Sequence, residues 1–136
     1  MVELPEVVAK AINDPKAFKV VTTISPEGDL HAIQVGACVS PEPEIIAVGA
    51  ILMQHTSKNM ESMQKKGQAV AIAIGKEMES YQVMAKVQVY QTEGPLYDAM
   101  SENIKKLGLQ LRGVWILEPI EVWNQSATYE AGKRMV

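Results

Sequence analysis

A short polar segment, Gln54 to Asn59, carries most of the chemistry that this sequence can offer. It follows an apolar run and contains two hydroxyl groups, on Thr56 and Ser57, and the ammonium group of Lys58. If a helix begins here, its free backbone N–H groups and the positive end of its dipole suit a phosphate group. Thr56 and Ser57 are equally ordinary helix caps. The segment therefore predicts either a phosphate site or a capped helix start.

Few other residues suggest catalysis or metal binding. His31 and His55 are far apart in the sequence, and no acid or thiol stands at the spacing of a metal site, so we expect no bound metal. His31 follows a turn and is expected on the surface of a strand. Cys38, the single cysteine, is expected to be a small core residue without a disulfide partner. No Ser, His and Asp arrangement suggests a hydrolase, and we predict no catalytic side chain.

The composition indicates a single domain that spans residues 1–136. A hydrophobic share of 47% and a charged share of 21% are ordinary for a folded protein and exclude disorder. The net charge of −3, without a cluster of Lys and Arg, argues against a nucleic-acid partner. No apolar run approaches the roughly 20 residues that span a bilayer, and the first residues lack the charge of a signal peptide. We therefore expect a soluble, cytoplasmic protein with no membrane partner.

Hydrophobic periodicity divides the first half of the chain into a helix and three strands. Spacings of three and four predict a helix from Leu4 to Ile12, and a period of two predicts strands afterwards. The expected strands are Phe18 to Ile24, Leu30 to Val39 and Glu44 to Ile51. The first two form a hairpin around the Pro26–Asp29 turn.

The second half alternates helices and strands in the same way. The expected elements are a helix from Thr56 to Lys66 capped by Thr56 or Ser57, a strand from Ala69 to Ile74, a strand from Tyr81 to Gln91, a helix from Pro95 to Gly108, and a strand from Gly113 to Trp123. In the Tyr81 strand, alternate residues up to Val89 are expected to face inward. In the last strand, Pro119 indicates a bulge or an edge, and Trp115 and Trp123 are expected in phase with Leu117.

These elements predict an α+β fold, a small antiparallel split β-barrel of about six strands with short flanking helices. The Glu44 and Ala69 strands are apolar on both faces, so each needs cover on two sides. A barrel has one interior, and the helices of so small a protein cover little more. We therefore expect a second copy of the chain to complete the cover, giving a homodimer.

The order of elements resembles the pyridoxamine 5′-phosphate oxidase-related family of FMN-binding split barrels. The likeness rests on the Pro26–Asp29 hairpin turn, the Thr-x-x-Asn-Met start of the helix at Thr56, and the Tyr81–Lys86 strand. It resembles the small FMN-binding proteins and flavin reductases of that family. The larger oxidases have a Ser-Arg-Lys string where this chain has Thr56, Ser57 and Lys58, and an Arg-containing C-terminal segment that this sequence lacks.

The resemblance implies an FMN site between the subunits of a dimer. The residues that it implies at the phosphate are Thr56, Ser57 and Lys58, with His55 and Asn59 close by. Those implied near the flavin ring are Ile33, Gln34 and Val35 and the run from Gly49 to Gln54, which includes Ala50. Gln34 is the polar side chain among apolar neighbours on its strand.

The family likeness leaves three functions open. The first is an enzyme that takes hydride from NAD(P)H through FMN, and the second is a carrier of FMN or electrons. In both, the cofactor supplies the chemistry and the protein supplies orientation and electrostatics. The third is a split barrel without flavin that binds another ligand, such as haem.

Overall fold

Eight antiparallel strands form one curled sheet in the computed structural model, which describes residues 2–136. Three helices accompany it, so the fold is α+β, with more strands than the six expected. In chain order the elements are α1 (Glu6–Asn13), β1 (Phe18–Ile24), β2 (Leu30–Val35), β3 (Cys38–Glu42), β4 (Ile45–Ala50), α2 (Gln54–Lys66), β5 (Ala69–Lys76), β6 (Glu79–Gln91), α3 (Pro95–Lys105), β7 (Gly113–Asn124) and β8 (Lys133–Arg134).

The chain crosses from one edge of the curled sheet to the other at Gly36. The strand order is β2-β1-β5-β6-β7-β4-β3, with β8 paired to β7. Thus β2 and β3 lie at opposite ends of the order although two residues join them, and the Gly49 N–H donates to the carbonyl of Ala37 at 2.7 Å beside this crossing. The prediction of one strand from Leu30 to Val39 is therefore wrong. The alternation of apolar residues continues without interruption through the bend at Gly36, so the sequence pattern does not reveal the break between the two strands.

Buried aliphatic side chains fill the inside of the curl. Val21, Ile72, Val83 and Val122 are neighbours across four adjacent strands, and each is fully buried. Burial of each such side chain contributes about 1.5–3 kcal/mol. Helix α1 and helix α2 contribute further buried side chains to this core.

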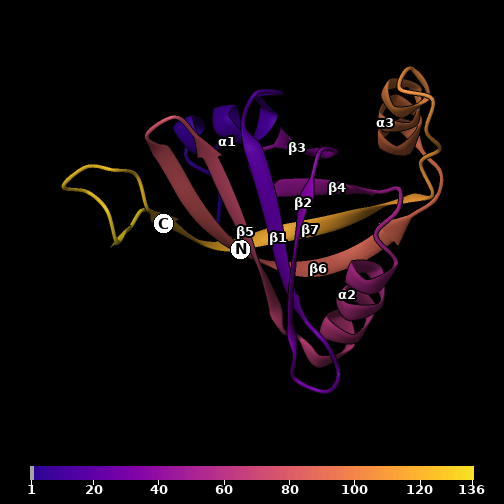
Figure 1. Ribbon diagram of the computed structural model, residues 1–136, viewed down its shortest axis with the longest axis horizontal. Helices are drawn as coiled ribbons and strands as arrows, with labels where there is room; N and C mark the ends of the chain where they lie inside the picture. The colour runs from indigo at the N-terminus through magenta and orange to yellow at the C-terminus, as the bar shows by residue number, and fades with distance from the viewer. Residues whose placement is uncertain (1) are drawn as a thin grey trace.

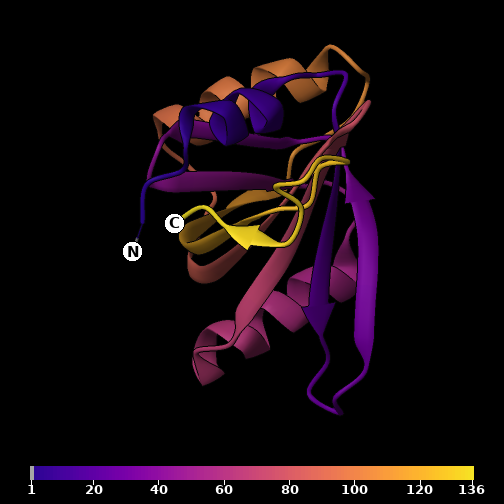
Figure 2. The same cartoon turned by 90° about the vertical axis from the view of Figure 1, so that its left-hand side faces the viewer.

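Helix α3 covers the outer face of β4 and forms a second core. Met100 and Ile104 of α3 pack with Ala47 of β4 and Val114 of β7. Figures 1 and 2 show α1 and α3 toward one end of the molecule and α2 toward the other. Both faces of β4 are therefore covered within one chain, which corrects the expectation that this strand needs a second copy. None of the three helices in residues 2–136 has the length and apolarity needed to cross a membrane.

Two bulges in the β6–β7 pair change which side chains face the core. The register skips Ile120 on β7 and Gln88 on β6. The first skip confirms the bulge expected near Pro119 and reverses the alternation beyond it, so Trp123 is out of phase with the buried Leu117. After the second skip Val89 is 43% exposed. The predicted inward orientation of Val89 and the predicted phase of Trp123 are therefore wrong.

Candidate functional site

A pocket of about 570 Å³ opens where β2, the Gly36 bend, the end of β4 and the start of α2 meet. This volume lies within the roughly 300–1,000 Å³ that is usual for sites binding small molecules and cofactors. The residues that line it are His31, Ile33, Gln34, Val35, Gly36, Ala37, Gly49, Ile51, Leu52, Met53, Gln54, His55, Thr56 and Lys58. The crossing at Gly36 forms the pocket, because it brings β2 near the loop that follows β4.

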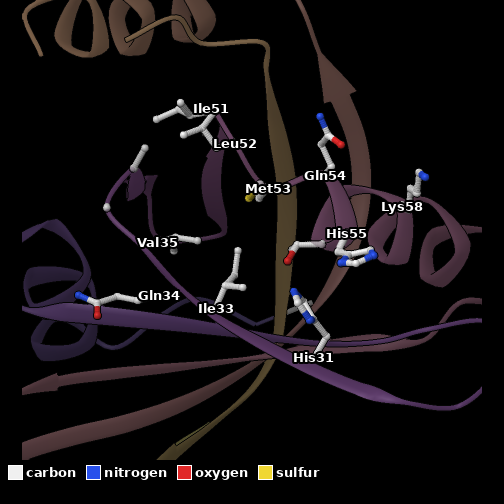
Figure 3. A pocket seen from close by; sticks show the side chains of 14 residues that line it. His31, Ile33, Gln34, Val35, Ile51, Leu52, Met53, Gln54, His55 and Lys58 are labelled. Carbon is white, nitrogen blue, oxygen red and sulfur yellow. The ribbon is translucent and has the colours of Figure 1, made fainter. Parts of the chain in front are cut away.

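The pocket has an apolar side and a polar side. Figure 3 shows Ile33, Val35 and Ile51 on one side, and His55 and Lys58 with the start of α2 on the other. Leu52 extends the apolar side and is 79% exposed. The arrangement suits a ligand with a flat apolar part and a charged polar part.

Helix α2 begins with three unpaired backbone amides at the pocket. The helix starts at Gln54, two residues earlier than expected, and its N-cap Met53 makes no side-chain capping bond. The first amide to bond is that of Ser57, which donates to the carbonyl of Met53 at 3.0 Å. The amides of residues 54–56 precede the first bonded turn and have no helical acceptor. The prediction that Thr56 or Ser57 caps the helix is therefore wrong, and the start of α2 remains available to an anion.

Thr56 places a buried hydroxyl on the pocket wall. The residue is fully buried, and in the chain from residue 2 onward its Oγ1 is the one buried side-chain polar atom without a hydrogen-bond partner. An unsatisfied buried hydroxyl costs about 1–3 kcal/mol. A ligand atom that accepts its proton would remove this cost, so Thr56 fits a role in ligand binding.

Ser57 and Asn59 face away from the main pocket. The Oγ atom of Ser57 accepts a hydrogen bond from the indole Nε1 of Trp115 at 3.1 Å. The side chain of Asn59 is buried, and its Nδ2 donates to Oγ1 of Thr23 on β1 at 3.0 Å. Ser57 and Ala50 line a smaller neighbouring hollow, and Asn59 lines neither. Asn59 therefore holds α2 to the sheet.

Gln34 lies on the rim of the pocket. It is exposed, and the strand alternation puts its side chain on the face of β2 opposite to Ile33 and Val35. Figure 3 shows it directed away from the two histidines and Lys58. The orientation of the Gln34 side chain therefore does not support the expected contact with a bound ring.

His31 is a partly exposed residue of β2, as expected, and it also lines the pocket. Its ring and that of His55 face each other edge to face, with centroids 5.5 Å apart (Figure 3). Because side chains alternate along a strand, His31 is on the same face of β2 as Ile33 and Val35. This alternation in the sequence could have identified His31 as a residue near the candidate site. Within residues 2–136, no group of three His, Cys, Asp or Glu side chains could hold a metal ion.

Comparison of this structure with solved structures identifies the architecture. HupZ of Group A Streptococcus superposes with a TM-score of 0.76 at 17% sequence identity, covering 97% of this chain and 100% of HupZ. An FMN-binding protein from Syntrophomonas wolfei gives a TM-score of 0.72 at 11% identity, covering 88% and 85% of the two chains. A Lactobacillus delbrueckii protein assigned as a pyridoxamine 5′-phosphate oxidase gives 0.68 at 14% identity, covering 89% and 93%. The chain has the split-barrel fold of the pyridoxamine 5′-phosphate oxidase-like proteins.

Split barrels of this shape differ in the ligands that they bind. HutZ, a haem storage protein from Vibrio cholerae, has the same fold with a TM-score of 0.64 at 12% identity, covering 92% of this chain and 97% of HutZ. No family model matches the sequence, and no curated protein matches it. The shared fold therefore does not by itself identify a ligand for this chain.

Proposed function

We propose that the pocket binds FMN and that the protein is a redox flavoprotein. One observation carries this proposal. The three unbonded amides at the start of α2 and the side chain of Lys58 lie on the same side of the pocket, and the other side is apolar. A flavin mononucleotide has the same division, because a phosphate group is joined through a short chain to a flat ring system. The shared fold with an FMN-binding protein supports this choice.

The chain's own residues suit three tasks in this role. The amides of residues 54–56, the hydroxyl of Thr56 and the charge of Lys58 would bind the phosphate. The aliphatic groups of Ile33, Val35 and Ile51 would hold the ring and exclude water from one side of it. FMN, when bound, exchanges hydride or single electrons with its partners. We propose NAD(P)H as the donor class.

Absorbance spectroscopy of the purified protein tests flavin binding directly. After incubation with FMN and removal of excess ligand, we expect flavin bands at a ratio of one FMN per chain. A protein that stays colourless with micromolar FMN contradicts the proposal. Anaerobic stopped-flow mixing of the loaded protein with NADPH then separates an enzyme from a carrier, since only the enzyme loses its flavin absorbance on the millisecond-to-second scale of ordinary turnover.

The facing pair of His31 and His55 favours haem as a second candidate ligand. A neutral imidazole nitrogen is a common ligand of iron, and the pair lines the same pocket as the apolar residues Ile33 and Val35. The shared fold with HutZ supports this candidate. Titration of the wild-type protein and of the two single histidine-to-alanine variants with haemin tests whether haem binds through this pair. A Soret band that shifts in His31→Ala or His55→Ala favours haem, and spectra identical to those of free haemin exclude it.

We also propose that the protein acts as a homodimer, through the outer face of β1, β5 and β6. Val20, Thr22, Ala71, Ala73 and Met84 are cross-strand neighbours on this face, uncharged and half-buried or exposed. A biological interface should bury more than about 1,000 Å². Sedimentation velocity at micromolar concentration should give a dimer, and Ala73→Arg should give a monomer. A wild-type monomer removes this proposal.

A further inference from the structure

A second, smaller hollow of about 140 Å³ adjoins the main pocket. The residues that line it are Ala50, Ile51, Met53, Gln54, Ser57, Tyr90 and Arg112, and three of these, Ile51, Met53 and Gln54, also line the main pocket. None of these seven residues is acidic. The hollow combines one cation with hydroxyl and amide groups and apolar walls.

Arg112 supplies a charge that the described chain does not neutralise. Its side chain is exposed, while its backbone N–H donates to the carbonyl of Ala50 at 2.9 Å and fixes the residue beside β4. In residues 2–136, no carboxylate lies within ion-pair distance of the guanidinium group. Tyr90 and Arg112 line the same hollow. Partial burial raises the pKa of the Tyr90 phenol, and the positive charge of Arg112 opposes that rise.

Tyr90 and Ser57 line the hollow together with Arg112. A Cβ at Gly113 would lie 2.2 Å from Cζ of Tyr90, so a glycine is needed for the phenol ring to lie against β7. The ring also packs on Trp115, with centroids 4.6 Å apart. Because the Trp115 indole donates to Oγ of Ser57, the proton of that hydroxyl is left to donate to another acceptor.

We propose that this hollow is a binding site for a small oxyanion, a carboxylate or phosphate group, held by Arg112 with the hydroxyls of Tyr90 and Ser57. A guanidinium group presents paired donors that match the two oxygens of such a group, and no acid in the hollow opposes it. The site does not require flavin. Because Gln54 lines both hollows, an anionic molecule held here lies beside whatever ligand occupies the main pocket, where a substrate or an effector would be placed.

The two tryptophans provide a reporter and an internal control for this site. The indole N–H of Trp115 donates to Ser57, whereas that of Trp123 donates to Oε1 of Glu121 at 3.0 Å, elsewhere on β7. In ¹H–¹⁵N spectra of the ligand-free protein, inorganic phosphate or acetate at constant ionic strength should shift the Trp115 indole signal saturably and leave that of Trp123 unchanged.

Two variants separate this site from the start of α2. Arg112→Gln keeps a side chain of similar length and should weaken the phosphate response at least about tenfold. Lys58→Gln removes the same charge from the main pocket and should leave the response within about twofold. Tyr90→Phe keeps the ring packing and should weaken the response by a smaller factor. A response absent in the wild type, or lost in Lys58→Gln and kept in Arg112→Gln, overturns the proposal.

Repeating the titration with flavin identifies the source of the oxyanion. If the phosphate of FMN itself occupies the hollow, FMN should shift the Trp115 signal and block inorganic phosphate, while riboflavin does neither. If a separate molecule occupies it, inorganic phosphate should still shift the signal in the FMN-loaded protein. Failure of FMN to bind leaves the ligand-free titration valid, so the two proposals can fail independently.

Discussion

Replacing Lys58 by glutamine should weaken FMN binding about tenfold and leave riboflavin binding nearly unchanged. Lys58 lines the main pocket, but its side chain is exposed. A hydrogen bond to a charged group contributes about 1.5–3 kcal/mol, whereas an ion pair in full contact with solvent contributes up to about 1 kcal/mol. A partly screened contact to phosphate should therefore contribute about 1.4 kcal/mol, which is a factor of ten in the dissociation constant.

The helix start should supply the rest of the preference for the phosphorylated flavin. The unbonded amides of residues 54–56 and the hydroxyl of Thr56 remain in the variant. We expect wild-type protein to bind FMN at least about a hundredfold more tightly than riboflavin, or roughly 2.8 kcal/mol. Lys58→Gln should then retain a preference of about tenfold.

Quenching of flavin fluorescence in parallel titrations measures both affinities. Lys66→Gln is the matched control, because it removes the same charge at the other end of α2. Eight residues of helix separate the two by about 12 Å, which exceeds the Debye length of about 8 Å at physiological salt. An unchanged ratio of affinities in Lys58→Gln, or an equal fall in Lys66→Gln, would refute the role of Lys58.

Three further outcomes follow from other contacts. Asn59→Ala removes the buried hydrogen bond to Thr23, so it should lower the free energy of unfolding, measured with urea, by about 1–3 kcal/mol. The preference for FMN over riboflavin should remain. Loss of that preference without loss of stability would show that Asn59 contributes to ligand binding. Burial raises the pKa of Cys38 to about 12, so at pH 8 about one thiol in ten thousand is ionised, and Ellman's reagent should react only after unfolding. The hydrogen bond between Lys76 and Asp14 lowers the pKa of Asp14 below 3.8 and raises the pKa of Lys76 above 10.5. The stability that this bond contributes is therefore present between pH 3.8 and pH 10.5. It is lost as the pH falls through the lowered pKa of Asp14 or rises through the raised pKa of Lys76. Lys76→Met should therefore lower the urea midpoint of unfolding at pH 7. It should also reduce the fall of that midpoint at acidic and at alkaline pH. A midpoint with the same pH dependence as the wild type would exclude a contribution from this ion pair.

Local patterns in the sequence were enough to locate most elements. The hairpin of β1 and β2, the strands β5 and β6, and the start of α3 at Pro95 lie where periodicity and turn residues predict them. These elements are determined by neighbours along the chain, since a proline or an alternation acts within a few residues. The sequence also directed attention to residues 54–58, several of which line the pocket, because a run of polar side chains after an apolar strand is a local feature.

The tertiary structure decided which of those residues meet. His31 and His55 come together because the chain crosses at Gly36 and places β2 near the loop after β4. Asn59 reaches Thr23 because α2 packs against β1. The alternation of a strand indicates which side chains share a face but not what that face contacts. The curl of the sheet is a property of all its strands together, and it brings together residues that no local spacing connects.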